Sequence, residues 1–471
     1  MKAKNIKVLV SGIIMLIAIT ATAQESTTLY HMKGLPQGTM FNPALHNDSS
    51  AVVLGLPGLS GVYFGLNSDF AVNDLIHHGT GSLADSLVID INGFHNSLKD
   101  HNTFRQDFDL SLFFLGFRTK KTFITLSINE KESARIGFEK KLVTFLKDGN
   151  GSSLGEVQDL GDLTFNAYHY REFALGVSHE LMDGRLSVGA KVKALYGKAA
   201  LQTNKLNFKV ETASDASSVK LTSDMDLNFS APVTPKYDDD DYFNGFEDNF
   251  SANDYIFNSD NMGMAFDFGA VFKITPKITV SASIVDIGKI PFKNGVYNVV
   301  HKETYNWEGL DFSNSFDDTD PSYISAHDMA ENEMDKLKAV VKPKESEVTS
   351  KSFDMDLPTK VFVGGTYTMG DKLNFGLLDR LFMYDGETMN ALTLSANAML
   401  AKFFSVSGSY SAIDGRYDNL GLGMAVRLGC LQLYMVNDNL LALADPAKAQ
   451  FVNIRFGINM LFGRNYRKVV F

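Results

Sequence analysis

An alternation of apolar and polar residues near the end of the chain constrains its fold most. From Val452 to Phe462 an apolar residue recurs at every second position, and Asn453, Arg455, Gly457 and Asn459 lie between them. Side chains of a β-strand point alternately to its two faces. A strand of about 10 to 12 residues with one apolar and one polar face is typical of a transmembrane β-barrel, whose outer surface is apolar and whose interior is polar.

The N-terminus predicts export. Lysines at positions 2, 4 and 7 precede an apolar run from Val8 to Ile19, and the small residues Ala21-Thr22-Ala23 follow it. This order of charged region, apolar core and cleavage site predicts that residues 1–23 are a cleavable signal peptide. The alternative is an uncleaved anchor helix, but the run is short for a membrane span.

The strand pattern recurs along most of the chain, in segments joined by short turns. Beyond the leader, no window offers the ~20 consecutive apolar residues of a membrane-spanning helix. In hydrocarbon, only helices and closed barrels satisfy their backbone polar groups. The sequence therefore predicts an all-β fold: a transmembrane antiparallel β-barrel of about 14 strands in the cell outer membrane. The clearest segments are 108–116, 124–128, 173–181, 186–196, 278–284, 392–400, 404–410, 420–428 and 451–462.

Composition excludes several classes of function. The formal net charge of −11 leaves no electrostatic footprint for nucleic acid. The single cysteine, Cys430, excludes an intrachain disulfide and a Cys-based zinc site; we expect a free thiol buried against lipid or a neighbouring strand. The chain has no G-x-S-x-G, H-E-x-x-H or P-loop motif. We therefore predict that the protein is not an enzyme and has no cofactor.

Two long polar segments interrupt the strand pattern, at residues 232–261 and 297–357, and both are predicted to be extracellular loops. The first contains the acidic run Asp238–Asp241, which could bind Ca²⁺ or form a solvated loop that divalent ions bridge to lipopolysaccharide. The second contains a predicted helix from Ser325 to Val341. One face of this helix carries Ala330, Met334, Leu337 and Val341, which suit either packing within the loop or a partner.

The N-terminal segment after the leader, residues 24–50, has little periodicity. It contains Leu35-Pro36-Gln37-Gly38 and the motif Asn42-Pro43-Ala44, and a Gly-Leu-Pro-Gly-Leu-Ser-Gly run follows at 55–61. This region resembles that of an uncharacterised family of Gram-negative outer-membrane β-barrels related to FadL-type fatty-acid transporters and PorV-like barrels.

The resemblance implies that residues 24–50 fold into the barrel, residues 51–471, as a plug or hatch, with Asn42, Pro43 and Ala44 inside it. The alternative for these three residues is an ordinary Asx-Pro turn.

Four polar residues at positions that alternate with apolar ones are predicted to face the lumen. They could line a conduction path, or they could pair with acidic residues of the plug or loops, because buried charges are normally paired. These residues are Arg427, Asn453, Arg455 and Asn459.

Two hypotheses of function follow. The first, implied by the resemblance to FadL-type proteins, is passive uptake of small hydrophobic molecules through a plugged barrel. The second is a non-transporting, PorV-like scaffold whose loops hold a cell-envelope or exported protein. An ion-conducting porin is a third. In each case the barrel contacts outer-membrane lipid and lipopolysaccharide.

Overall fold

The structure is a computed structural model that describes residues 27–45, 50–310, 312, 323–370, 372–413 and 415–463. The predicted signal peptide, residues 1–23, lies outside the described residues, as do residues 464–471. Among the described residues, no helix is long and apolar enough to cross a membrane.

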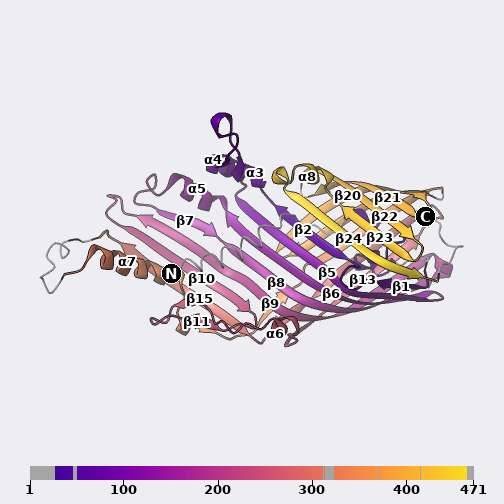
Figure 1. Ribbon diagram of the computed structural model, residues 1–471, viewed down its shortest axis with the longest axis horizontal. Coiled ribbons are helices and arrows are strands. Elements are labelled where there is room, and N and C mark those ends of the chain that lie inside the picture. Colours follow the sequence, from indigo (N-terminus) through magenta and orange to yellow (C-terminus); the bar gives the residue numbers. More distant parts are fainter. Residues whose placement is uncertain are drawn as a thin grey trace.

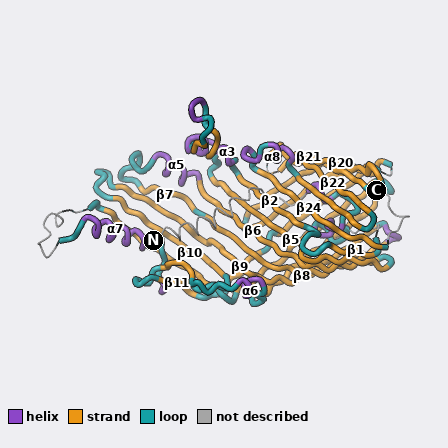
Figure 2. Tube along the Cα trace, in the orientation of Figure 1, coloured by secondary structure: helices purple, strands orange, loops and turns teal. Residues whose placement is uncertain are grey.

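The chain forms one closed antiparallel barrel of 14 strands (Figures 1 and 2). This confirms the predicted fold class and strand number. The first strand is interrupted and consists of β1 (Val52–Gly55) and β2 (Val62–Ser68). The others are β5 (His101–Thr119), β6 (Thr122–Glu139), β8 (Thr164–Leu181), β9 (Leu186–Thr212), β13 (Asn261–Lys273), β14 (Ile278–Phe292), β18 (Thr359–Met369), β19 (Leu373–Tyr384), β20 (Glu387–Ala401), β21 (Phe404–Ile413), β22 (Arg416–Leu428), β23 (Leu431–Asn437) and β24 (Phe451–Phe462).

The last strand closes the barrel. β24 pairs antiparallel with β23 on one side and with both β1 and β2 on the other; Val52 lies opposite Phe462, and Val62 lies opposite Phe456. The six residues 56–61 separate β1 from β2, whereas only Gly457 and Ile458 separate the corresponding partners on β24. The wall therefore carries a local insertion at this point.

The two faces of the wall differ as the alternation predicts. On β13, Met264, Phe266 and Phe268 are 41–50% exposed on the outer face, whereas Asp267 between them is completely buried. Apolar outer side chains and polar inner ones suit a wall that has lipid on one side and a polar interior on the other.

All connections at one end of the barrel are short, and the long connections all lie at the other end, together with the short β19–β20 and β21–β22 connections (Figure 1). β9 has 27 residues and continues past the barrel, where it pairs with β10 (Val219–Ser230), which in turn pairs with β15 (Val296–Trp307). The interval 297–357, predicted as a loop, therefore begins as a strand. It also contains α7 (Ala326–Val341), β16 (Val348–Thr349) and β17 (Phe353–Asp356), and the interval 232–261 contains β11 (Pro235–Tyr237), β12 (Phe243–Phe246) and α6 (Ala252–Ile256).

Shorter elements lie at the same end as the long connections. A small unit between β2 and β5 consists of α3 (Val72–Leu75), β3 (Ile76–His78), η2 (Gly81–Leu83), β4 (Leu87–Ile89) and α4 (Ile91–Ser97). α5 (Lys140–Asp148) and β7 (Val157–Asp162) follow β6, and η4 (Glu345–Glu347) follows α7. α8 (Leu440–Ala444) and η5 (Pro446–Lys448) join β23 to β24. At the opposite end, η3 (Met182–Gly184) joins β8 to β9.

Cys430 is exposed on the surface of the protein, so the expectation that a neighbouring strand covers it is wrong. Gly429 and Cys430 form the tight turn between β22 and β23, and the Cys430 carbonyl accepts a hydrogen bond from the Leu461 N–H of β24 at 2.7 Å. Gly429 has a φ of 64°, a conformation that favours glycine.

Candidate functional site in the plugged barrel

Residues 27–45, here called the plug, lie inside the barrel and are almost entirely buried. They contain two short helices, α2 (Thr27–Tyr30) and η1 (Pro36–Met40). Pro36 suits the first turn of η1 because proline lacks the N–H that would be unsatisfied there, and the Thr39 hydroxyl donates a hydrogen bond to the Pro36 carbonyl at 2.9 Å. The plug thus holds its own local conformation.

The motif Asn42-Pro43-Ala44 forms a turn and also contacts the wall. The Asn42 side-chain oxygen accepts a hydrogen bond from the Ala44 N–H at 2.9 Å, which is an Asx turn. Its amide donates to the Tyr30 hydroxyl and to the Ala270 and Ala282 carbonyls at 3.2–3.4 Å. Asn42 thus makes the turn and also joins residues 27–45 to β13 and β14.

Glycines in the wall make room for the plug. A Cβ at Gly269 would overlap the Asn42 side chain, and a Cβ at Gly189 would overlap the Pro43 and Ala44 backbone. A Cβ would likewise overlap His31, Thr28 or Met32 where they approach the wall. The exception is Gly364, where a Cβ would make a tight contact with His31 at 3.3 Å. The six wall glycines that face the plug are Gly189, Gly269, Gly364, Gly376, Gly421 and Gly423.

Hydrogen bonds join the plug to opposite sides of the barrel. Near its start, Thr28 donates through both N–H and hydroxyl to Asp438, which follows β23, and its hydroxyl lies 2.6 Å from that of Ser409. Near its end, the Phe41 carbonyl accepts from Ser283 of β14 at 2.7 Å, and the Ala44 carbonyl accepts from Ser187 of β9 at 3.1 Å. The plug therefore spans the lumen.

The four residues predicted to face the lumen occupy two regions. Asn453, Arg455 and Asn459 project inward from β24, at most 1% exposed. Asn459 exchanges hydrogen bonds with Gln37 of the plug at 2.9 and 3.2 Å. Arg427 lies apart from them, half-buried near the end of β22.

Arg455 has a partner that differs from the expected one. Its guanidinium lies 3.1 Å from the Asp109 carboxylate on β5 and 4.2 Å from the centre of the Tyr63 ring. We expected an acidic residue of the plug or of a loop. The acid instead comes from the wall, because β2, which separates β5 from β24, brings the inward faces of those strands together.

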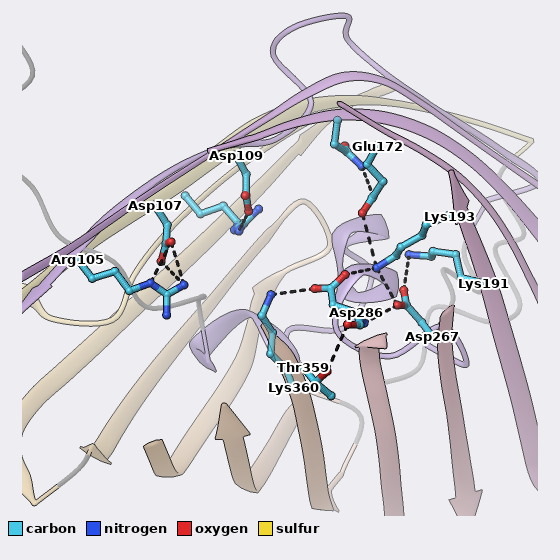
Figure 3. A network of polar contacts seen from close by, with 12 residues as sticks. Arg105, Asp107, Asp109, Glu172, Lys191, Lys193, Asp267, Asp286, Thr359 and Lys360 are labelled. Carbon is cyan, nitrogen blue, oxygen red and sulfur yellow. Dashed lines mark hydrogen bonds and ion pairs between the residues drawn. The ribbon is translucent and has the colours of Figure 1, made fainter. Parts of the chain in front are cut away.

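A layer of buried charges lies on the inner face of the barrel wall (Figure 3). The Lys193 ammonium lies at its centre, 2.7 Å from Asp267 and 3.7 Å from Glu172, and donates a hydrogen bond to Asp286. The Lys360 ammonium reaches the other Asp286 oxygen at 2.9 Å. These charges come from β8, β9, β13, β14 and β18, which are consecutive strands of the wall, so the layer ties five neighbouring strands together on their inner face.

A backbone irregularity turns Asp286 into this layer. Val285 and Asp286 are adjacent on β14, yet both are buried, which a regular strand would not allow. The β13–β14 register shifts here, and Asp286 has a φ of 62°, an uncommon conformation for a residue other than glycine. The resulting bulge re-aims the carboxylate toward Lys193 and Lys360.

The charged layer also contacts the plug. Lys191, next to the central group, donates a hydrogen bond to the Thr39 carbonyl at 2.9 Å and lies 3.8 Å from Asp267. The layer was not predicted from the sequence. The available signal was a set of isolated charges at inward positions of apolar strands, such as Asp267.

A cavity of about 460 Å³ lies between the plug and the wall at the end with the tight turns. Leu35 and Leu45 of the plug, with Met399 and Phe404 of the wall, give it an apolar lining. Its volume is in the range of ligand-binding pockets. Basic side chains also line it: Lys33, Arg185, Lys273, Lys402 and Arg427.

These features define a class. A closed antiparallel barrel with an apolar outer face, a polar interior and an internal plug is a plugged outer-membrane β-barrel. The family follows from the sequence: the profile described as "Family of unknown function (DUF5723)" matches residues 43–438, so the chain belongs to this family. A search of curated protein sequences finds no significant match.

Solved structures provide a second comparison. The chain is similar to a Pseudomonas aeruginosa FadL homologue at 10% identity and a TM-score of 0.41, with 94% of this chain and 99% of that chain covered. It is also similar to the Pseudomonas putida toluene transporter TodX at 8% identity and a TM-score of 0.37, covering 93% and 96%. The N-terminal motifs suggested the same kind of protein.

Proposed function

We propose that the protein is a passive channel through which small hydrophobic molecules cross the outer membrane, with the plug as its gate. The observation that carries this proposal is the cavity of about 460 Å³ that the plug and the wall form together. A molecule bound there would contact both surfaces. Its affinity would therefore depend on the position of the plug.

The gating step follows from how the plug is held. The plug bonds the wall on opposite sides of the lumen, at Asp438 and Ser409 and at Ser187 and Ser283. We infer that a molecule passes only when the plug shifts. The contacts that hold it are hydrogen bonds and side-chain packing, which can break and re-form. A ligand that binds a shifted plug more tightly than the closed one moves the population toward the shifted state.

A reversible crosslink tests the gate. The Thr28 and Ser409 hydroxyl oxygens lie 2.6 Å apart, so Thr28→Cys with Ser409→Cys, in a Cys430→Ser background, places two thiols within bonding reach. We expect proteoliposomes with the oxidised variant to take up labelled fatty acids or toluene more slowly than the same vesicles after reduction. The single Thr28→Cys variant is the control and should not respond to oxidant.

Two results count against the proposal. If vesicles with the unmodified protein take up neither probe faster than vesicles without protein, the protein is not such a channel. If the oxidised and reduced double variants transport at equal rates, the plug is not the gate.

A second candidate function is a scaffold for another protein, and α7 favours it. Val340 is buried and faces His301 of β15, which contacts the Val340 carbonyl at 3.2 Å. The stripe predicted from the sequence lies on an exposed face, with Met334 at 55% and Val341 at 47% exposure. An exposed apolar helix face of this kind is a common mode of peptide and protein recognition.

A photo-crosslinker tests the scaffold. Placed at position 334 in intact cells, it should give one adduct of discrete mass, and the additional substitution Leu337→Glu should remove that adduct. The same crosslinker at Glu331, on the neighbouring polar face, is the matched control. The absence of a discrete adduct at 334 would contradict the scaffold without affecting the channel proposal.

A further inference from the structure

The hairpin of β3 and β4, here called the rim hairpin (residues 76–89), presents an apolar face that no described part of the chain covers. Ile76 lies opposite Ile89, and His78 lies opposite Leu87. Residues two positions apart share a face of a strand, so these four side chains lie together. Leu87 is 68% and Ile89 is 67% exposed.

An isolated two-stranded hairpin is marginally stable in water, and this one has three residue pairs. A surface that covers its apolar face would stabilise it.

The base of the rim hairpin is firmly attached, so its direction is defined. Phe94 and Leu98 pack with Val143 of α5, and Phe70, Leu75 and Phe138 surround them. The Asp90 carboxylate caps α4 by accepting a hydrogen bond from the Gly93 N–H at 2.8 Å. Figure 1 shows the hairpin standing out to the side, away from the long axis of the molecule, beyond α3 and α4.

Strand β24 of the adjacent wall is about as long as the hydrocarbon core of a membrane is thick. β24 has 12 residues, and a tilted strand of about 9–11 residues crosses the hydrocarbon core. The start of β24 therefore lies at the outer boundary of the hydrocarbon. α8 and η5 immediately precede that point, and α3, at the base of the rim hairpin, contacts η5.

The apolar surface continues from the wall onto these elements. Ile454 and Phe456 belong to the lipid-facing side of β24, and Phe456 is 39% exposed. Above them, Leu441 and Leu443 of α8 are 57% and 51% exposed. The lipid-facing belt of the barrel thus extends past the end of its strands and toward the rim hairpin.

We propose that the rim hairpin and α8 contact the outer leaflet of the surrounding membrane, with Ile76, Leu87 and Ile89 inserted among the lipids. The occupant of the apolar face is lipid because the hairpin projects sideways from the rim, and its base contacts η5, next to the exposed apolar residues of α8 and β24. Residues 72–98 contain no lysine or arginine, so the attachment is apolar and does not require anionic head groups.

Fluorescence quenching in vesicles tests the contact. In a Cys430→Ser background, an environment-sensitive dye is attached to a single cysteine at Leu87, in zwitterionic phosphatidylcholine vesicles that carry a quencher on their acyl chains. A cysteine at Phe375 on the lipid-facing side of β19 is the lipid reference, and one at Ser217 in the exposed β9–β10 turn is the water reference. We expect quenching at position 87 close to that at 375, unchanged by high salt.

Two outcomes would overturn the proposal. If the dye at position 87 behaves as it does at 217, the hairpin stands in water. If the dye is shielded from water but not quenched, and the Leu87→Cys protein forms disulfide-linked dimers, a second copy covers the face. Because Leu87 is exposed, its substitution should leave folding intact, which heat-dependent gel mobility checks.

Discussion

At the scale of single residues, the docking of the plug depends on wall positions that have no side chain as well as on the side chains that make contacts. The wall glycines permit the plug to approach the backbone of the barrel, and Gly269 is the most demanding because the Asn42 amide occupies the space of its missing Cβ. Asn42 in turn bonds carbonyls on both β13 and β14. One methyl group at this position would therefore push the plug away from two strands.

We predict that Gly269→Ala weakens plug docking. Overpacking of a filled interior costs about 1–3 kcal/mol, and shifting the plug should raise the conductance measured in planar bilayers. Gly408→Ala is the matched control, because no atom lies within 4 Å of a Cβ there. Equal conductance of the two variants would contradict the role of Gly269.

The central lysine of the charged layer has a different kind of importance. Lys193 faces three carboxylates that are themselves buried. Burying an isolated charge in a low-dielectric interior is costly. The lysine therefore lowers the free-energy cost of burying these three carboxylates. The layer holds together only while its charges are paired.

We predict that Lys193→Met destabilises the barrel by about 3–5 kcal/mol, the usual cost of removing one partner of a buried pair. Urea unfolding in lipid vesicles measures the change. Lys205→Met, which removes a lysine whose side chain is 51% exposed beside Asp224, should leave the midpoint unchanged. A small effect at both positions would mean that water already screens the layer.

At the scale of elements, strands and helices serve two environments. β9 begins in the barrel wall, where its side chains Lys191 and Lys193 point into the interior and Lys193 forms the centre of the charged layer. It ends in the sheet that it forms with β10 and β15. α7 packs on that sheet through Val340, and its Ser325 cap accepts a hydrogen bond from the Asp328 N–H at 3.1 Å. The exposed stripe of α7 is therefore not needed to hold the helix.

We predict that Val340→Glu detaches α7 and that Met334→Glu does not. Val340 is completely buried, so a carboxylate there would lack a partner. An exposed substitution usually changes stability by less than about 0.5 kcal/mol. Limited proteolysis should cleave the first variant faster within residues 326–341, and the second at the rate of the unmodified protein. Rapid cleavage of both would show that the stripe also supports the helix.

At the scale of the whole molecule, the two ends of the barrel are unlike. Tight turns join strands at one end, and the sheet of β9, β10 and β15 extends from the other. In barrels of this class, short turns face the periplasm and long loops face outward. The plug cavity lies at the end with the tight turns, so we expect it to face the periplasm.

We predict that an epitope inserted after Ala216, in the β9–β10 turn, binds antibody on intact cells. An epitope inserted after Lys120, in the β5–β6 turn, should bind only after the outer membrane is permeabilised. Both residues lie in turns and have positive φ angles of 58° and 50°, so the two insertions are matched in local structure. The reverse labelling pattern would require the opposite orientation.

The sequence predicted the barrel because the lipid on one side of each strand and the lumen on the other determine which residue types suit its alternate positions. A residue on the outer face of β13 or β24 contacts hydrocarbon whatever its neighbours in the chain are. The alternation of apolar and polar residues could therefore be recognised in the segment 451–462 and in most of the 14 strands. The strand β15 escaped prediction for the same reason. Outside the membrane no lipid imposes an apolar face on it, and its buried positions include the polar residues Asn298 and His301, of which His301 contacts α7. Tyr297–Trp307 therefore has no apolar period and was assigned to a loop.

What the sequence by itself determined is the chemistry of each position: an apolar outer face, a polar inner face, and a turn at Asn42-Pro43. The tertiary structure alone decided which of these positions meet. Lys193 and Asp286 are far apart in the chain, and only strand register and the bulge at Asp286 bring their charges together. In the same way, the Asn42 side chain lies against Gly269 only because the closed barrel encloses the plug. Such pairings depend on long-range geometry, which no local pattern encodes.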